Sequence, residues 1–284
     1  MVYFIYALIC LIWGSTWLAI KLGLEDSPPL WSAALRFVIA CAVLFVINRL
    51  RHIYYPRQWS EIWKIAMPGI FMYPGSYIPV YVAEVYIDSA LSAVLFASLP
   101  FFVAILSLVF LRGERIDYVA WIGLVIGLIG IVVIFYDSLQ QSKFVFLGVA
   151  MMLISAASAA LGMVLIRSRL QEMGIMIMAE IQLVAGTIFM ILAAMIFEPL
   201  AAFKVTLKSI GALLYLSIFG TVIGFLSYYW LLKKIKAIAL SQVTFINPII
   251  AVILGFLVLS EAFNANSIVG SVLIMGGVAM VIRK

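Results

Sequence analysis

The sequence predicts an all-α integral membrane protein with ten transmembrane helices, arranged as two inverted five-helix repeats. Three observations lead to this prediction. The 284 residues are 67% hydrophobic and only 11% charged, so too few polar side chains are present to cover a soluble domain of this size. Ten apolar stretches are each long enough to cross a bilayer as a helix. The second half of the chain also repeats a sparse pattern of the first half.

Eight of the ten stretches contain no charged residue. These are residues 1–20, 65–83, 89–111, 118–136, 144–166, 209–232, 237–260 and 262–282. The other two are 27–48, which contains Arg36, and 173–197, which contains Glu180. Because apolar and polar residues do not alternate within the stretches, helices are favoured over a barrel. Residues 1–20 lack the basic start of a cleavable signal peptide, so we interpret them as the first membrane helix.

Lysine and arginine gather in alternate connections. Thirteen of the 18 basic residues follow the second, fourth, sixth, eighth or tenth stretch, four lie in the remaining connections, and Arg36 lies inside a stretch. Basic loops favour the cytoplasmic side of a membrane. We therefore expect a multi-pass protein of the cell (plasma) membrane with both termini cytoplasmic. The net charge of +6 is explained by this topology signal and predicts no nucleic-acid partner.

The internal repeat is carried by prolines, glycines, glutamates and a short Ala-Leu-Ser motif. The matched positions are residues 90–92 with 239–241, Gly75 with Gly224, Phe96 with Phe245, Pro100 with Pro248, Glu114 with Glu261, Gly123 with Gly270, and Gly130 with Gly277. The repeats predicted from this match are residues 1–137 and 144–284. Because each holds an odd number of helices, the two must enter the membrane in opposite directions. Such inverted repeats are typical of alternating-access transporters, whose site lies between them.

Several motifs in order resemble the drug/metabolite transporter superfamily, EamA type. They are Trp13-Gly14-Ser15-Thr16, Pro28-Pro29 with Arg36, Pro100 with Gly113-Glu114-Arg115, and Asn247-Pro248 with Ser260-Glu261. The resemblance covers essentially the whole chain and implies export of small metabolites or drugs. It also implies a central cavity lined mainly by the first, third, fourth, sixth, eighth and ninth helices. Its expected partners are a small-molecule substrate and the lipid bilayer.

The third stretch is the most informative about a binding site. Tyr73, Tyr77 and Tyr81 recur at every fourth residue and therefore share one helix face. Prolines at positions 68, 74 and 79 interrupt the same helix, which is tolerated where neighbours or water satisfy the freed backbone groups. We expect this stripe to line a cavity; helix packing or an interfacial aromatic belt is the alternative.

Further substrate-binding candidates lie on four other stretches. They are Trp13, Thr16 and Trp17 on the first, Phe96 on the fourth, Tyr228 on the eighth, and Thr244 and Asn247 on the ninth. Small polar residues in membrane helices often serve only to join helices, which is the alternative for Thr16, Thr244 and Asn247. An aromatic wall favours organic solutes with an apolar portion and a few polar groups, and ring faces also attract cations.

Two charges and two prolines complete the set of candidates. Arg36 is either an anchor for an anionic substrate group or a structural side chain that snorkels outward or binds helix carbonyls. Glu180 is expected as a solvated carboxylate at a helix end, with titration during proton coupling as the alternative. Pro100 and Pro248 occupy matching positions and are predicted to permit bending of their helices.

The residue inventory argues against catalysis. The chain contains a single histidine, His52, and shows no nucleotide-binding loop, catalytic triad or metal-ligand cluster, so neither a cofactor nor a metal is expected. The sequence therefore predicts a secondary transporter, exporting amino acids or other small organic metabolites or drugs by alternating access through a central cavity. The alternative is a membrane-embedded enzyme or lipid flippase acting on an amphipathic substrate. The oligomeric state is left open.

Overall fold

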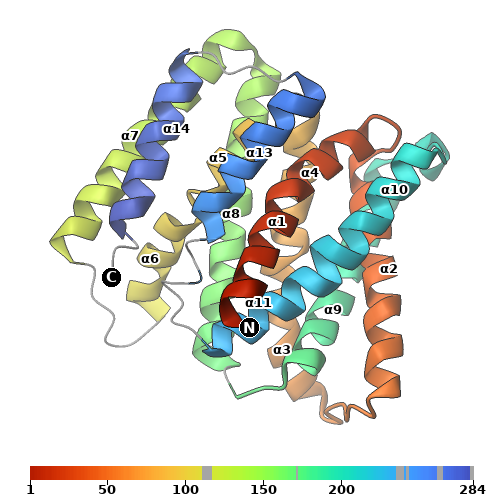
Figure 1. Cartoon of the computed structure of the whole chain (residues 1–284). Helices are drawn as coiled ribbons and strands as arrows, with labels where there is room; N and C mark the ends of the chain where they lie inside the picture. The colour runs from red at the N-terminus through yellow and green to blue at the C-terminus, as the bar shows by residue number, and fades with distance from the viewer. Residues whose placement is uncertain (111–116, 171, 235–239, 241–242, 261–264, 282–284) are drawn as a thin grey trace.

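The computed structural model describes residues 1–110, 117–170, 172–234, 240, 243–260 and 265–281, and within these ranges every regular element is helical. The helices of the first half are α1 (Val2–Leu24), α2 (Pro29–Leu50), α3 (Trp59–Met72), α4 (Pro74–Tyr86), α5 (Ser89–Phe96), α6 (Leu99–Phe110) and α7 (Tyr118–Gln141). Those of the second half are α8 (Lys143–Arg169), α9 (Ile175–Phe197), the 3-10 turn η1 (Leu200–Ala202), α10 (Leu207–Tyr215), the π-helix η2 (Leu216–Ile223), α11 (Gly224–Lys234), α13 (Val243–Leu259) and α14 (Ala265–Val281). Figure 1 shows them packed as one bundle.

Six helical segments of the described residues are long and apolar enough to cross a membrane. They are Val2–Leu24, Pro29–Leu50, Ser89–Phe110, Lys143–Arg169, Ile175–Phe197 and Leu207–Leu231. Shorter apolar helices lie at Tyr118–Ile134, Ile246–Leu259 and Ile268–Met280. With the α3–α4 pair, these helices coincide with the ten stretches predicted from the sequence. The prediction of an all-helical, multi-pass membrane protein is therefore confirmed.

Within the described residues, two of the ten predicted helices are broken rather than continuous. The stretch 65–83 divides at Tyr73, whose backbone (φ −100°, ψ −82°) is not helical, because a residue that precedes proline is driven out of the α region. Pro74 then begins α4, at a position that needs no N–H donor. In the stretch 89–111, helix α5 ends at Phe96, and helix α6 begins at Leu99, one residue before Pro100. Proline removes the backbone bond that would have continued the helix there.

The two halves are intermixed rather than side by side. The extensive helix contacts include α2 with α9, α1 with α13, and α4 with α8, each of which joins one half of the chain to the other. Figure 1 shows α1 beside α13 in the middle of the bundle. A core of buried apolar side chains runs continuously through these contacts. The space between the halves is therefore formed by both of them.

Helices α7 and α14 form the most extensive helix pair in the fold and lie side by side in Figure 1. Glycines permit the close approach: a Cβ on Gly130 would lie 2.6 Å from the carbonyl oxygen of Gly270, and one on Gly277 would overlap the carbonyl oxygen of Gly123. The sequence matches Gly123 with Gly270 and Gly130 with Gly277. Each glycine thus contacts the partner of the other, which is the reciprocal pattern that a two-fold axis generates. Of the other repeat-matched residues, Glu114, Ala239, Ser241 and Glu261 lie outside the described residues.

Candidate functional site

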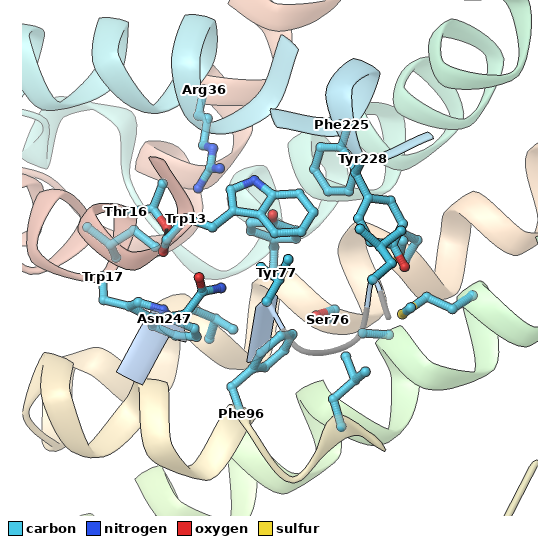
Figure 2. Close-up of a pocket in the computed structure, with 18 residues that line it drawn as sticks. Trp13, Thr16, Trp17, Arg36, Ser76, Tyr77, Phe96, Phe225, Tyr228 and Asn247 are labelled. Atoms are coloured by element: carbon cyan, nitrogen blue, oxygen red, sulfur yellow. Dashed lines mark hydrogen bonds between the residues drawn. The ribbon is translucent and has the colours of Figure 1, made fainter. Parts of the chain in front are cut away.

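A cavity of about 110 Å³ lies inside the bundle, well above the space that a single water molecule needs. Its walls come from α1, α3, α4, α5, α6, α8, α11 and α13, with Arg36 contributed by α2. All six helices that the family resemblance implied therefore take part. Its lining includes eight of the candidate residues: Trp13, Thr16, Trp17, Arg36, Tyr77, Phe96, Tyr228 and Asn247. Figure 2 shows these side chains converging on the cavity from several helices.

Aromatic rings make up much of the wall. The Trp13 ring lies 5.2 Å from that of Tyr228 and 5.6 Å from that of Phe225, measured between centroids. The Trp17 ring lies 5.5 Å from that of Phe96. These separations are typical of favourable aromatic pairs. The rings present an apolar surface with a few polar tips, as the sequence predicted for this wall.

Arg36 is the one charged residue among the described side chains that line the cavity. It is 1% exposed and therefore does not snorkel outward, and its hydrogen bonds to described residues go to side-chain hydroxyls. Its Nε donates to Thr221 Oγ1 at 2.9 Å, and its Nη1 donates to the Tyr81 hydroxyl at 3.3 Å. The guanidinium carbon also lies 4.8 Å from the centre of the Tyr77 ring, within the range of a cation–π contact.

The π-helix η2 positions this part of the wall. Trp13 Nε1 donates to the Gly220 carbonyl at 3.2 Å, and Thr221, the next residue, accepts from Arg36. A Cβ on Gly220 would lie 3.0 Å from Arg36 Nη2 and 2.9 Å from a methyl carbon of Thr16, so a larger residue there would displace these side chains. Short π-helical segments are frequent at functional sites. Here the π-helix binds a side chain of α1, Trp13, and a side chain of α2, Arg36, and both of these side chains line the cavity.

The tyrosine stripe does not form one wall of the cavity. Tyr77 lines it, but Tyr73 and Tyr81 are not among its lining residues. Tyr73 lies at the break between α3 and α4, so the three tyrosines do not share one continuous helix face. Tyr73 is buried and packs its ring against Phe37 and Phe225, at 5.5 and 5.0 Å. Tyr81 is also buried and reaches the site only through its hydrogen bond with Arg36.

Helix α13 contributes Asn247 to the cavity. With its amide oriented so that the nitrogen donates, Asn247 binds the carbonyls of Val243 at 3.1 Å and Cys10 at 3.3 Å, which ties α13 to α1. The side chain of Thr244 lies outside the described residues. The two prolines differ: Pro100 follows the break between α5 and α6, whereas Pro248 lies within α13.

Glu180 lies away from the cavity and is not the solvated helix-end carboxylate that the sequence predicted. It is 4% exposed. Its Oε2 accepts a hydrogen bond from Asn48 Nδ2 and another from the Tyr55 hydroxyl at 2.5 Å. Asn48 comes from α2 and Tyr55 from the segment that follows it. No cluster of three or more potential metal ligands occurs among the described residues.

Some lining residues were not selected from the sequence. Phe225, Ser76, Ile20, Met72, Leu99 and Met163 all border the cavity. Phe225 could have been found, because it directly follows the repeat-matched Gly224 and lies one helical turn from Tyr228. The aliphatic members carry no signal that separates them from ordinary packing residues.

A mainly apolar cavity inside a multi-pass helical bundle, with one buried charge among the described lining residues, is an architecture typical of membrane transporters. The comparisons with known proteins agree. The chain belongs to the EamA-like transporter family, whose profile matches residues 1–136 and again 146–283. It is a transporter-family protein and not an enzyme.

Individual relatives support the same assignment. The chain is 30% identical to an uncharacterized transporter of Archaeoglobus fulgidus, over 99% of this chain and 98% of that protein. It is 28% identical to the uncharacterized transporter YoaV of Bacillus subtilis, over 96% and 93% of the two chains. It is 30% identical to the uncharacterized inner membrane transporter YedA of Escherichia coli, over 86% and 78%. A solved crystal structure with 22% identity has the same fold, with a TM-score of 0.71 over 99% of this chain and 96% of its own.

Proposed function

We propose that the protein is a secondary transporter that exports small organic metabolites or drugs, amino acids among them, by alternating access through the central cavity. The observation that carries this proposal is the cavity itself, because helices of both halves of the chain line it. A site between two halves can open to either side when one half tilts against the other. Membership of the EamA-like family supports the proposal.

The proposed orientation is an inverted repeat in the cell membrane with both termini cytoplasmic. The alternation of basic connections supports this orientation, and the reciprocal glycine contacts between α7 and α14 support a two-fold relation between the halves. The relative from Escherichia coli is named an inner membrane transporter, which agrees with the location. Single cysteines placed at Gln58 and Gln141 should be labelled from opposite sides, with Gln58 cytoplasmic. Labelling of both from one side would exclude the inverted arrangement.

The transport proposal is tested by counterflow in proteoliposomes. Vesicles loaded with one candidate solute should accumulate the labelled form of the same solute, and the recovered label should be chemically unchanged. Empty vesicles and vesicles with heat-denatured protein are the controls. Accumulation of a chemically altered product would favour an enzyme, and movement of labelled lipid between leaflets without solute counterflow would favour a flippase.

A further inference from the structure

In the part of the chain that the structure describes, the recorded contacts of the Arg36 guanidinium are all with neutral groups. The hydroxyls of Thr221 and Tyr81 accept its hydrogen bonds, and Tyr77 contacts it with its ring and its hydroxyl. A buried charge without a counter-charge is costly, because neutral hydroxyls replace only part of the hydration that it loses. A guanidinium carries five N–H groups, so two hydrogen bonds leave further donors available toward the cavity.

We propose that the cavity binds small organic anions, with a carboxylate or similar planar anionic group held by Arg36 and an apolar body between the aromatic rings. This inference rests on the proposed transport function and specifies its substrate class. Arginine suits the task because its planar fork matches a carboxylate with two parallel hydrogen bonds. The bound anion supplies the charge that the protein itself does not supply.

The rest of the lining favours the same class of solute. The indole Nε1 of Trp17 is buried and has no hydrogen-bond partner, and an indole N–H can only donate. Trp17 and Arg36 therefore both offer donors to a solute that brings acceptors. The described residues that line the cavity include no aspartate or glutamate, so they offer no counter-charge to a solute ammonium.

The arrangement also excludes the cation site that an aromatic wall alone would suggest. The guanidinium of Arg36 already lies over the Tyr77 ring, 4.8 Å from its centre, and 5.4 Å from the centre of the Phe37 ring. The attraction of these ring faces for a positive charge is thus used by the protein itself. A second cation entering the cavity would meet the positive charge of Arg36 in a medium that screens it poorly.

The first experiment measures charge selectivity with matched probes on the full-length protein in detergent. Benzoate, benzyl alcohol and benzylammonium have similar bodies and differ in charge, and phenylalanine carries both charges. The thermal unfolding temperature of the protein should rise with benzoate and stay unchanged with benzylammonium, because a ligand that binds only the folded state raises its stability. The change in tryptophan fluorescence on ligand addition gives a second measurement of binding, and we expect Trp13 and Trp17 to contribute most of it. Comparing phenylalanine with benzoate shows whether the carboxylate that binds belongs to an amino acid or to a simple carboxylic acid.

The inference is overturned if benzylammonium or the alcohol stabilises the protein as well as benzoate does. It is equally overturned if neither benzoate, phenylalanine nor a short panel of aliphatic carboxylates has any effect. These outcomes need no mutant, so the inference stays testable even if changes at Arg36 prevent folding.

Variants then assign the selectivity to Arg36. Arg36→Gln should weaken benzoate binding at least about tenfold, as expected for loss of a charged hydrogen-bonding partner, and should remove the preference for benzoate over the alcohol. Arg49→Gln is the matched control, since Arg49 lies on the same helix, is exposed and is absent from the cavity lining.

Gly220→Ala keeps the charge of Arg36 but moves its guanidinium, and should weaken benzoate binding with less effect on binding of the alcohol. Unchanged benzoate affinity in a folded Arg36→Gln protein would show that the anion binds elsewhere.

Proteoliposome counterflow separates this inference from the transport proposal. Transport of a neutral or cationic solute, with no effect of carboxylates, would retain the transporter and reject the anion site. Tight binding of carboxylates without counterflow of any of them would retain the anion site and reject transport.

Discussion

Arg36 and Glu180 are both ionisable side chains buried in the helix bundle, on helices α2 and α9 that pack against each other. Their surroundings differ in kind. Arg36 has two neutral hydrogen-bond partners, lies over an aromatic ring and borders a cavity. Glu180 is not among the residues that line this cavity, and its Oε2 accepts from two protein donors, Asn48 and Tyr55.

The difference indicates two different roles for buried charge in one molecule. Glu180 joins α9, α2 and the segment after α2, so its hydrogen bonds hold the predicted cytoplasmic end of the bundle together. Arg36 lies about 18 Å away from Asn48 along the same helix, from the rise of 1.5 Å per residue, and it lines the cavity. We therefore expect changes at Glu180 to affect stability and changes around Arg36 to affect binding.

The largest effect on stability is expected for Glu180→Ala. Removing the carboxylate leaves the buried Asn48 amide, which is 0% exposed, with the long 3.4 Å hydrogen bond to the Met176 carbonyl in place of its short bond to Glu180. The weaker hydrogen bonding of a buried amide and the small cavity left behind should together cost about 3 kcal/mol of unfolding free energy. Denaturant unfolding of the protein in detergent measures this loss, and benzoate affinity should be unchanged.

Glu180→Gln is the control for that variant, because the amide oxygen can still accept from Asn48 and Tyr55. It should retain most of the stability. A stable Glu180→Ala protein with weakened ligand binding would remove the distinction between the two charges.

At the Arg36 end, the corresponding change is Tyr77→Ala. It removes the ring that lies beneath the guanidinium and lines the cavity, and should weaken binding by about 1–3 kcal/mol. Tyr77→Phe should have a milder effect, since the ring is retained. The matched control is Tyr73→Ala, four residues earlier, which should lower stability without a specific effect on affinity because Tyr73 packs outside the lining. Equal losses of affinity in both alanine variants would mean that Tyr77 acts only through packing.

The extent of the membrane fold could be predicted from the sequence because hydropathy is a local property. Each stretch of about 20 apolar residues must satisfy its backbone internally, and a helix does this without help from distant residues. The breaks in the third and fourth helices have local causes too, since Pro74 and Pro100 stand beside them. Their effect on side-chain direction was not predicted: because the helix breaks at Tyr73, the three tyrosines do not share one continuous helix face.

The surroundings of the two charges could not be predicted. Tyr55 reaches Glu180 across 125 residues of sequence, and Arg36 reaches Thr221 across 185. Hydropathy describes neither contact, so Glu180 was expected in solvent and Arg36 was left between two interpretations. The π-helix that carries Thr221 and Gly220 also has no sequence pattern that separates it from the adjoining α-helices. Sequence alone thus singled out the two charges but did not predict their partners.

The comparison also predicts which part of the bundle moves. Pro100 follows the α5–α6 break and directly succeeds Leu99, which lines the cavity, whereas Pro248 lies inside a continuous helix. Pro100→Ala should slow counterflow several-fold with little loss of expression or ligand binding, because it restores a backbone hydrogen bond near the break. Pro248→Ala should also slow counterflow, but less. Unchanged rates in a well-folded double variant would show that both prolines are static.

The smallest effect is expected for Tyr55→Phe, which removes one of the two hydrogen bonds to Glu180 and nothing else. Tyr55 is 38% exposed, so the loss of unfolding free energy should stay below about 1 kcal/mol.

Burial and the hydrogen bond to Glu180 raise the pKa of Tyr55 from its ordinary 10 to about 12, because both disfavour the phenolate. A group whose pKa is raised on folding contributes stability below its unfolded pKa and loses it as the pH rises toward the folded value. The thermal stability of the natural protein should therefore exceed that of Tyr55→Phe at pH 8, and the difference should shrink between about pH 10 and 12. A difference that stayed constant across this range would mean that the hydroxyl stabilises the segment by packing and not by donating to Glu180.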